Sequence, residues 1–147
     1  MRILEVNTLY PTTIYPKTVG GAEWSVRNLS EALVSAGECV EVFRVAPSEC
    51  AYSVEIVNGV KVHSAPIRNI YWPFTTTRKN IGSRFLWHLI DDRSKCHSIL
   101  RSIIEQFQPD VLHTNNLTGI GTGVWVEARR RRIPVVHTLR DYSLLCP

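Results

Sequence analysis

The chain has 147 residues, 17 of them basic and 13 acidic, which gives a net charge of +4 at neutral pH. With 44% hydrophobic and 20% charged residues, it is too apolar for a disordered segment and long enough for one domain with its own core. Its apolar stretches fall far short of the ~20 residues of a membrane-spanning helix, and the first residues do not form a signal peptide. We therefore expect a single cytoplasmic domain over residues 1–147.

The first third of the chain predicts a strand, a long loop, a helix and a second strand. Apolar residues from Arg2 to Asn7 indicate a buried strand, and the prolines and threonines of Thr8–Val19 cannot continue it. Apolar side chains then recur every three or four residues from Ala22 to Ala36, which favours an amphipathic helix ended by Gly37. Cys39–Val45 follows as a second strand, which completes a β-loop-α-β unit typical of parallel sheets.

The middle of the chain predicts a hairpin followed by helix. Val54–Val57 and Val60–His63 flank Asn58-Gly59, a dipeptide that readily supplies the positive φ angles of a tight turn. We expect this hairpin to be an insertion in the sheet. Helical spacing covers Ile81–Phe107, with a break expected near Asp91-Asp92.

The last third predicts two more strands around a helix. Asp110–Thr114 forms a third strand, Thr118 caps a helix over Gly119–Arg131, and Pro134–Leu139 forms a fourth strand. The alternation of strands and helices predicts an α/β fold, a doubly wound, mainly parallel Rossmann-like sheet with an inserted β-hairpin. Ligands of such sheets collect at the carboxyl ends of the strands, here followed by Asn7-Thr8, His113–Thr118 and Arg140–Ser143.

Gly20-Gly21 stands immediately before the first helix. Paired glycines let the backbone approach a ligand, and free N–H groups at a helix start bind phosphate, so a phosphate site is one interpretation. A glycine-rich helix entry without a ligand is the other. Gly119–Gly123 is not a GxGxxG fingerprint and indicates close helix packing instead, and no P-loop pattern occurs.

His113, Asn115 and Asn116 leave the third strand together. A histidine in a core strand often serves structure, and asparagines favour turns, yet their position at the carboxyl edge equally favours a ligand site. Arg140-Asp141, after the fourth strand, is either an ion pair or a set of ligand contacts. The four cysteines have neither CxxC spacing nor histidines at metal-ligand distance, so we expect neither a metal site nor disulfides.

Two basic features leave alternatives open. The run Arg129–Arg132 complements the dipole at a helix end, or forms a patch for anionic lipid or nucleic acid. No nucleic-acid motif or aromatic-interleaved basic stripe accompanies it, so we expect no nucleic-acid partner. The aromatic residues of 72–87 lie near Arg78, Lys79 and Arg84 and serve either the core or a peripheral contact with the inner face of a membrane.

Together these segments resemble the amino-terminal domain of a retaining GT-B glycosyltransferase of the family 4 type. The resemblance covers essentially the whole chain, and it rests on the opening strand and three phrases, Gly20–Glu23, Pro109–Asn116 and Val135–Pro147. It implies half of a GT-B fold, with transfer of a sugar from a nucleotide-sugar donor to a saccharide or lipid-linked acceptor. The anomeric configuration is retained, and the donor is a co-substrate, so no cofactor is implied.

The resemblance also assigns expected roles to residues. Gly20 and Gly21 would bind the donor diphosphate, Asn115 and Asp141 would be catalytic, and the cleft that receives sugar and acceptor would be lined by His113, Asn116, Arg140 and Tyr142. Many members carry a histidine where this chain has Asn115, and another where it has Arg140. The donor-binding carboxyl-terminal domain of the family is absent from these residues, so we expect the chain alone to be inactive. The alternative function is a non-catalytic Rossmann-like binding or interaction domain. It is favoured by Asn115, which stands where many members of the family carry a histidine.

Overall fold

The structure is a computed structural model that describes residues 1–15, 20–74, 79–92 and 95–140. Within these ranges the chain forms six strands and four helices. Their order is β1 (Arg2–Val6), α1 (Gly21–Ser35), β2 (Cys39–Ala46), β3 (Ser53–Val57), β4 (Val60–Pro66), α2 (Ile81–Asp92), α3 (Ser98–Phe107), β5 (Val111–Thr114), α4 (Gly123–Arg130) and β6 (Val135–His137).

The strands form one sheet in the order β3-β4-β2-β1-β5-β6. Every neighbouring pair is parallel except the β3-β4 hairpin, so β1 lies inside the sheet with its carboxyl end between those of β2 and β5. The mainly parallel α/β fold is confirmed. The predicted hairpin is present and is continuous with the main sheet, because β4 pairs with β2 in parallel.

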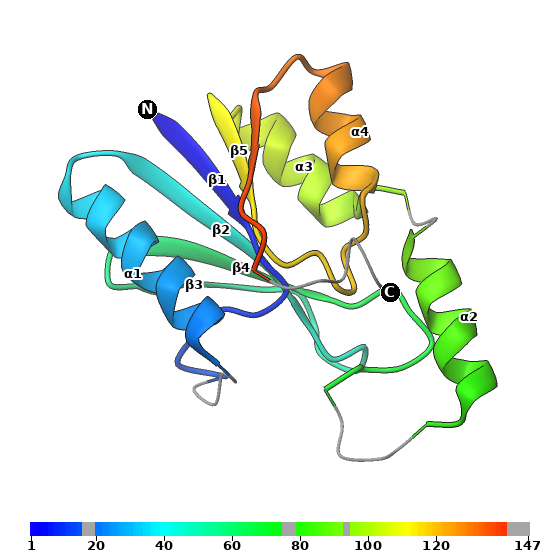
Figure 1. The fold of residues 1–147 in the computed structure, drawn as a ribbon. Helices are drawn as coiled ribbons and strands as arrows, with labels where there is room; N and C mark the ends of the chain where they lie inside the picture. The colour runs from blue at the N-terminus through cyan, green and yellow to red at the C-terminus, as the bar shows by residue number, and fades with distance from the viewer. Residues whose placement is uncertain (16–19, 75–78, 93–94, 141–147) are drawn as a thin grey trace.

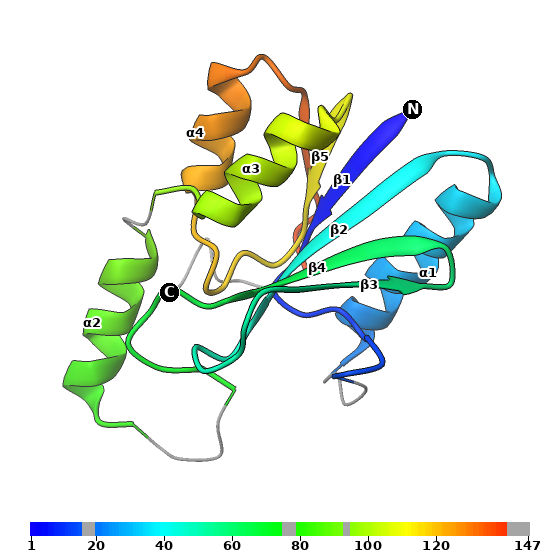
Figure 2. The same cartoon turned by 180° about the vertical axis from the view of Figure 1, so that it is seen from behind.

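Helices cover both faces of the sheet (Figures 1 and 2). Side chains of a strand point alternately to the two faces, and the two buried clusters follow that alternation. Ile3 and Val42 pack with α1 through Val26, whereas Leu4 and Phe43 belong to the cluster that α2, α3 and α4 cover. Odd-numbered residues of β1 and β5 therefore face α1. The polar residues among them meet on this face of the sheet.

His97 precedes α3 and caps it. Its Nδ1 accepts a hydrogen bond from the backbone N of Ile99 at 3.2 Å, and its Nε2 donates to the Pro66 carbonyl at 3.0 Å. Burial of the ring lowers the pKa of His97, although the Pro66 carbonyl acts in the opposite direction. The neutral imidazole thus joins the end of β4 to the start of α3. The predicted helical break separates α2 from α3.

The helix after β5 begins later than predicted. Thr118 does not cap it, because Gly119 and Gly121 have φ angles of +81° and +74° that a helix cannot contain, and α4 starts at Gly123. The interpretation of these glycines as close packing is confirmed at Gly119, where an added Cβ would lie 2.6 Å from Cδ1 of Ile67. None of the described helices is long and apolar enough to cross a membrane.

Candidate functional site

Polar residues meet where β1 and β5 end, as predicted for a parallel sheet. The Thr8 backbone N donates to the Asn116 carbonyl at 2.9 Å, and the Asn116 N donates to Oδ1 of Asn7 at 3.0 Å. Oδ1 of Asn116 lies 2.9 Å from the Thr8 hydroxyl and accepts from the Thr118 N at the same distance. The Asn116 side chain therefore ties the two loops that leave the central strands.

The buried carboxylate of Glu5, in β1, forms hydrogen bonds with side chains at the end of β5. It has no exposed surface, and it points to the α1 face beside the odd-numbered residues of β5. Oε1 of Glu5 is 2.9 Å from Nδ1 of His113, and Oε2 accepts from Nδ2 of Asn115 at 3.1 Å. Nε2 of His113 then contacts the Thr138 hydroxyl at 2.8 Å, just beyond β6. Three strand ends are thus connected through one acidic side chain.

Arg140 extends this network to the first helix. Its Nε donates to Oδ1 of Asn115 at 2.7 Å, and its Nη1 donates to the Ser25 hydroxyl at 3.0 Å. Ser25 lies one helical turn after Gly21, so the guanidinium spans from β5 to the start of α1. The predicted site residues Asn115, Arg140 and the glycine pair are in this way brought to one edge of the sheet.

The start of α1 is open at the glycine pair. Gly20 is the N-cap residue, with φ +120°, and supplies no side-chain cap to the first N–H groups of the helix. A Cβ on Gly21 would meet nothing within 4 Å, whereas one on Gly20 would lie 3.1 Å from Oε2 of Glu23. This Glu23 oxygen is buried without a hydrogen-bond partner. Gly20 and Gly21 are both exposed, so the backbone at the start of α1 is accessible to a ligand.

The geometry qualifies the predicted role of Asn115. Asn115 is 2% exposed, and both polar groups of its side chain are engaged, by Glu5 and by Arg140. It holds its neighbours in place, and its catalytic role stays a prediction. Asp141 and Tyr142 lie outside the described residues. The described side chains contain no group of three or more His, Cys, Asp or Glu residues that could hold a metal ion.

Sequence reasoning missed Glu5, Ser25 and Thr138. The signal for Glu5 was available, because it is the one acid within the apolar run Ile3–Val6, where an ionised group needs partners. Ser25 and Thr138 carried no such signal, since each acts through a neighbour that only the fold supplies.

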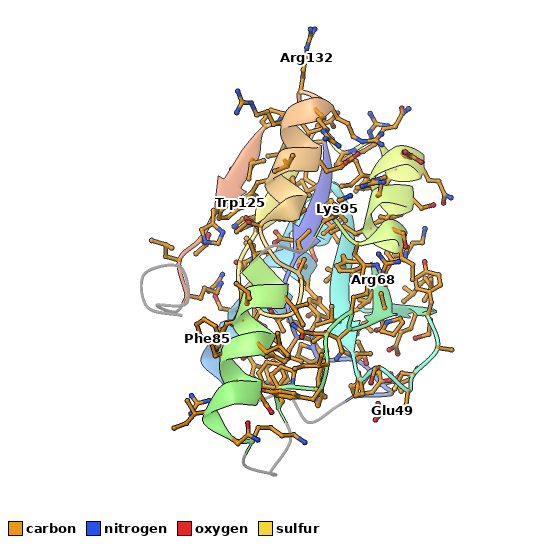
Figure 3. The ribbon with its side chains drawn as sticks, turned by 90° about the vertical axis from the view of Figure 1, so that its right-hand side faces the viewer. Glu49, Arg68, Phe85, Lys95, Trp125 and Arg132 are labelled. Carbon is orange, nitrogen blue, oxygen red and sulfur yellow. The ribbon has the colours of Figure 1, made fainter. Side chains whose placement is uncertain are left out.

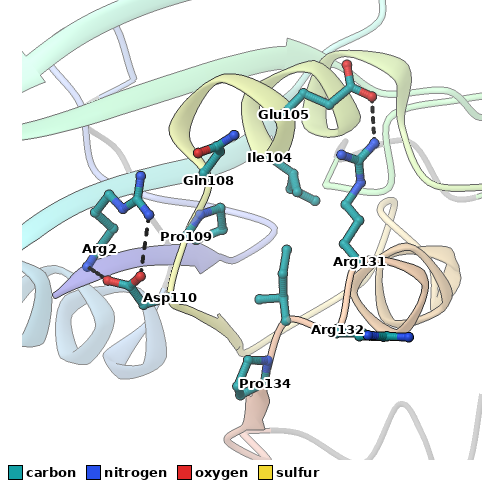
Figure 4. Close-up of a pocket in the computed structure, with 10 residues that line it drawn as sticks. Arg2, Ile104, Glu105, Gln108, Pro109, Asp110, Arg131, Arg132 and Pro134 are labelled. Atoms are coloured by element: carbon teal, nitrogen blue, oxygen red, sulfur yellow. Dashed lines mark hydrogen bonds and ion pairs between the residues drawn. The ribbon is translucent and has the colours of Figure 1, made fainter.

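A cavity of about 430 Å³ lies at the opposite, amino end of the sheet (Figure 4). Two ion pairs border it, one between Arg2 and Asp110 and one between Arg131 and Glu105, at 3.5 and 2.5 Å. Arg132 points away from its centre (Figure 4). Because its facing charges already neutralise one another and it is remote from the strands' carboxyl ends, this cavity is not the candidate site.

Comparisons with known proteins show the family of the chain. Residues 20–146 match the family described as Glycosyl transferase 4-like domain. The chain belongs to this family. The match includes the glycine pair, the segment after β5 and the segment after β6, which are the parts that build the candidate site. The chain is thus a glycosyltransferase 4-like domain.

Two individual proteins extend the comparison. The "Uncharacterized 42.6 kDa protein in cps region" of Klebsiella pneumoniae is 43% identical over 148 residues, which cover all of this chain and 38% of the relative. Sucrose-phosphate synthase from Thermosynechococcus elongatus shares the fold, with a TM-score of 0.54 and 17% identity over 95% of this chain and 33% of the synthase. The chain therefore spans 38% of the length of the first protein and 33% of the second.

Proposed function

We propose that this glycosyltransferase 4-like domain is the amino-terminal, acceptor-side domain of a retaining enzyme that transfers a sugar from a nucleotide-sugar donor. We infer retention and the donor type from the family alone. The observation that carries the proposal is the Asn115–Arg140–Ser25 connection, which fixes a cation beside the open glycine pair at the carboxyl edge of the sheet. In the proposed enzyme, a second domain holds most of the donor.

The chemistry proposed for this domain is stabilisation of the leaving diphosphate. Backbone N–H groups at Gly20 and Gly21 face the developing negative charge, and the dipole of α1 favours an anion at that end. Arg140 adds a positive charge that Asn115 and Ser25 hold in position, so little reorganisation is needed during the reaction.

The acceptor is proposed to enter the same cleft along the ends of β5 and β6. His113 and Asn116 lie there, and Asp141 and Tyr142 are proposed to complete the cleft, with Asp141 and Asn115 acting on the reacting sugar. The acceptor is a saccharide or a lipid-linked sugar.

A peripheral contact with the inner face of a membrane accompanies a lipid-linked acceptor in this proposal. Trp87 anchors α2 to the body, whereas Ile81 and Phe85, one turn apart, are 84% and 71% exposed beside the basic Lys79 and Arg84. Replacing Phe85 by Ser should weaken sedimentation with phosphatidylglycerol vesicles, and unchanged sedimentation would remove this part of the proposal.

The second candidate function is a non-catalytic binding domain of the same fold. It is favoured by Asn115, whose two polar groups are both occupied and which cannot shuttle a proton. Isothermal titration with a panel of nucleotide sugars separates the two candidates. Binding of one nucleotide sugar together with transfer supports the enzyme, and uniform absence of both supports the binding domain.

The substitution Gly21→Trp in the full-length protein tests the role of the glycine pair. Because a side chain at Gly21 meets open space, the variant should fold normally and lose at least about tenfold in transfer rate by blocking the diphosphate. Gly82→Trp, on the exposed side of α2, is the matched control and should keep the wild-type rate. Equal rates for Gly21→Trp and the control would refute the proposed role.

A further inference from the structure

A groove of about 360 Å³ lies between α3 and α4, on the face of the sheet opposite to α1. Lys95, Arg101, Glu127 and Arg130 line it with the start of α4 at Gly123. Lys95 faces outward on the side of the molecule where α2, α3 and α4 lie (Figure 3). The Glu5 network and the glycine pair belong to the α1 face, so this groove is distinct from the candidate site.

The groove carries more positive charge than its one acid can neutralise. Glu127 is already engaged, because its Oε1 is 2.8 Å from Nε of Arg131 and its Oε2 is 3.4 Å from Nε of Arg101. Lys95 and Arg130 form no ion pair with any side chain that the structure describes. Nε of Arg101 is buried and donates no hydrogen bond. The groove therefore presents two cations, Lys95 and Arg130, that are unpaired among the described residues.

The positions of these groups are fixed by the fold. A parallel backbone bridge between Lys95 and Gly123 places the lysine at the start of α4, and Arg130 lies two helical turns further along the same helix. The arginine run divides at this point, since Arg131 turns to Glu127 and Glu105 while Arg130 lines the groove. A helix end alone does not account for this arrangement, because Lys95 comes from a different segment.

We propose that this groove binds a phosphate or diphosphate group. Arginine and lysine are the side chains that recognise such anions, and a ligand bound here would pair cations that otherwise repel one another. The volume lies at the lower end of the range of small-molecule sites, which leaves room for a sugar or a glycerol beside the phosphate. The phosphate belongs either to a soluble phosphorylated compound or to a lipid headgroup.

The test titrates the full chain with inorganic pyrophosphate and follows backbone amide shifts by NMR. Shifts at Lys95, Arg101 and Gly123 are expected, and the double variant Lys95→Ala/Arg130→Ala should bind pyrophosphate at least tenfold more weakly. Arg129→Ala is the matched control, because Arg129 is exposed in the same run and does not line the groove. Its affinity should stay within twofold of the wild type.

The proposal is overturned if pyrophosphate shifts no amide of the groove, or if the control loses as much affinity as the double variant. Shifts confined to Gly20 and Gly21 would likewise overturn it, while leaving the proposed donor site intact. Conversely, a failure of the Gly21→Trp experiment does not bear on the groove.

A second arm distinguishes the two sources of the phosphate. If the ligand is a headgroup, phosphatidylglycerol vesicles sediment the wild type and Arg129→Ala but not the double variant, and phosphatidylcholine vesicles sediment none of them. If vesicles do not discriminate between the variants while pyrophosphate does, the ligand is a soluble phosphorylated compound.

Discussion

Replacing Glu5 by Gln should change the tautomer of His113. With Glu5 ionised, its carboxylate only accepts hydrogen bonds, so His113 carries its hydrogen on Nδ1 and accepts from the Thr138 hydroxyl at Nε2. In the variant, the amide oxygen keeps the bond from Asn115, and the amide nitrogen becomes a donor toward Nδ1. The imidazole hydrogen then moves to Nε2, where it is donated to Thr138. Both contacts of residue 5 survive this rearrangement.

The magnitudes follow from what each variant leaves unpaired. Glu5→Gln turns two charge-assisted hydrogen bonds into neutral ones and removes a buried charge, so we expect a loss of about 1 kcal/mol in the free energy of unfolding. Glu5→Ala leaves two buried donors without an acceptor, at about 1–3 kcal/mol each, and opens a cavity. We expect that variant to lose at least about 3 kcal/mol.

Two assays check this reasoning. Imidazole ¹⁵N shifts report the tautomer of His113, and urea denaturation at pH 7 gives the free energies of both variants. The reasoning is refuted if the Gln variant keeps the Nδ1–H tautomer, or if the Ala variant is as stable as the Gln variant. The refutation would mean that Glu5 does not hold His113 and Asn115 in place.

Two further predictions concern stability. Because burial lowers the pKa of His97, the free energy of unfolding should decrease as the pH falls below about 6.5, by at most about 1.4 kcal/mol per pH unit from this group. His97→Asn keeps a helix cap that does not titrate, so urea denaturation at pH 7.5 and 5.5 should show a smaller pH dependence than in the wild type. Gly20→Ala should lose about 1–3 kcal/mol, because φ is +120° and the new Cβ would lie 3.1 Å from Oε2 of Glu23. Thermal unfolding checks this against Gly82→Ala in α2, which should be neutral or stabilising.

The order and type of the elements could be predicted because each depends on local pattern. Periods of two and of three to four residues, glycine stops and the Asn58-Gly59 turn predicted the order of the elements, with α2 and α3 as one helical stretch broken near Asp91-Asp92. The predicted start of α4 was wrong, since Gly119 and Gly121 adopt positive φ angles, and Gly119 packs against Ile67 and donates a hydrogen bond to Asp91. That reason is tertiary, and no local pattern contains it.

The location of the candidate site in the fold could be predicted from the sequence. The hydrogen bonds that connect its residues could not. Because carboxyl ends of parallel strands share an edge, the grouping of His113, Asn115 and Arg140 with the glycine pair followed from the fold class. The carboxylate that connects them was not found, because Glu5 precedes β5 by more than 100 residues and meets it only through strand pairing.

The arginine run shows why sequence proximity does not assign a shared role. Arg131 pairs with two acids, Arg130 lines the phosphate groove that we propose, and Arg132 lies at the cavity of the opposite end with a left-handed φ of +57°. Consecutive helical residues point about 100° apart, so a helix end distributes its cations over separate surfaces. A patch for one polyanion along the whole run would require Arg131 to abandon its ion pairs with Glu105 and Glu127, whereas the groove uses Arg130, which has no ion pair among the described residues.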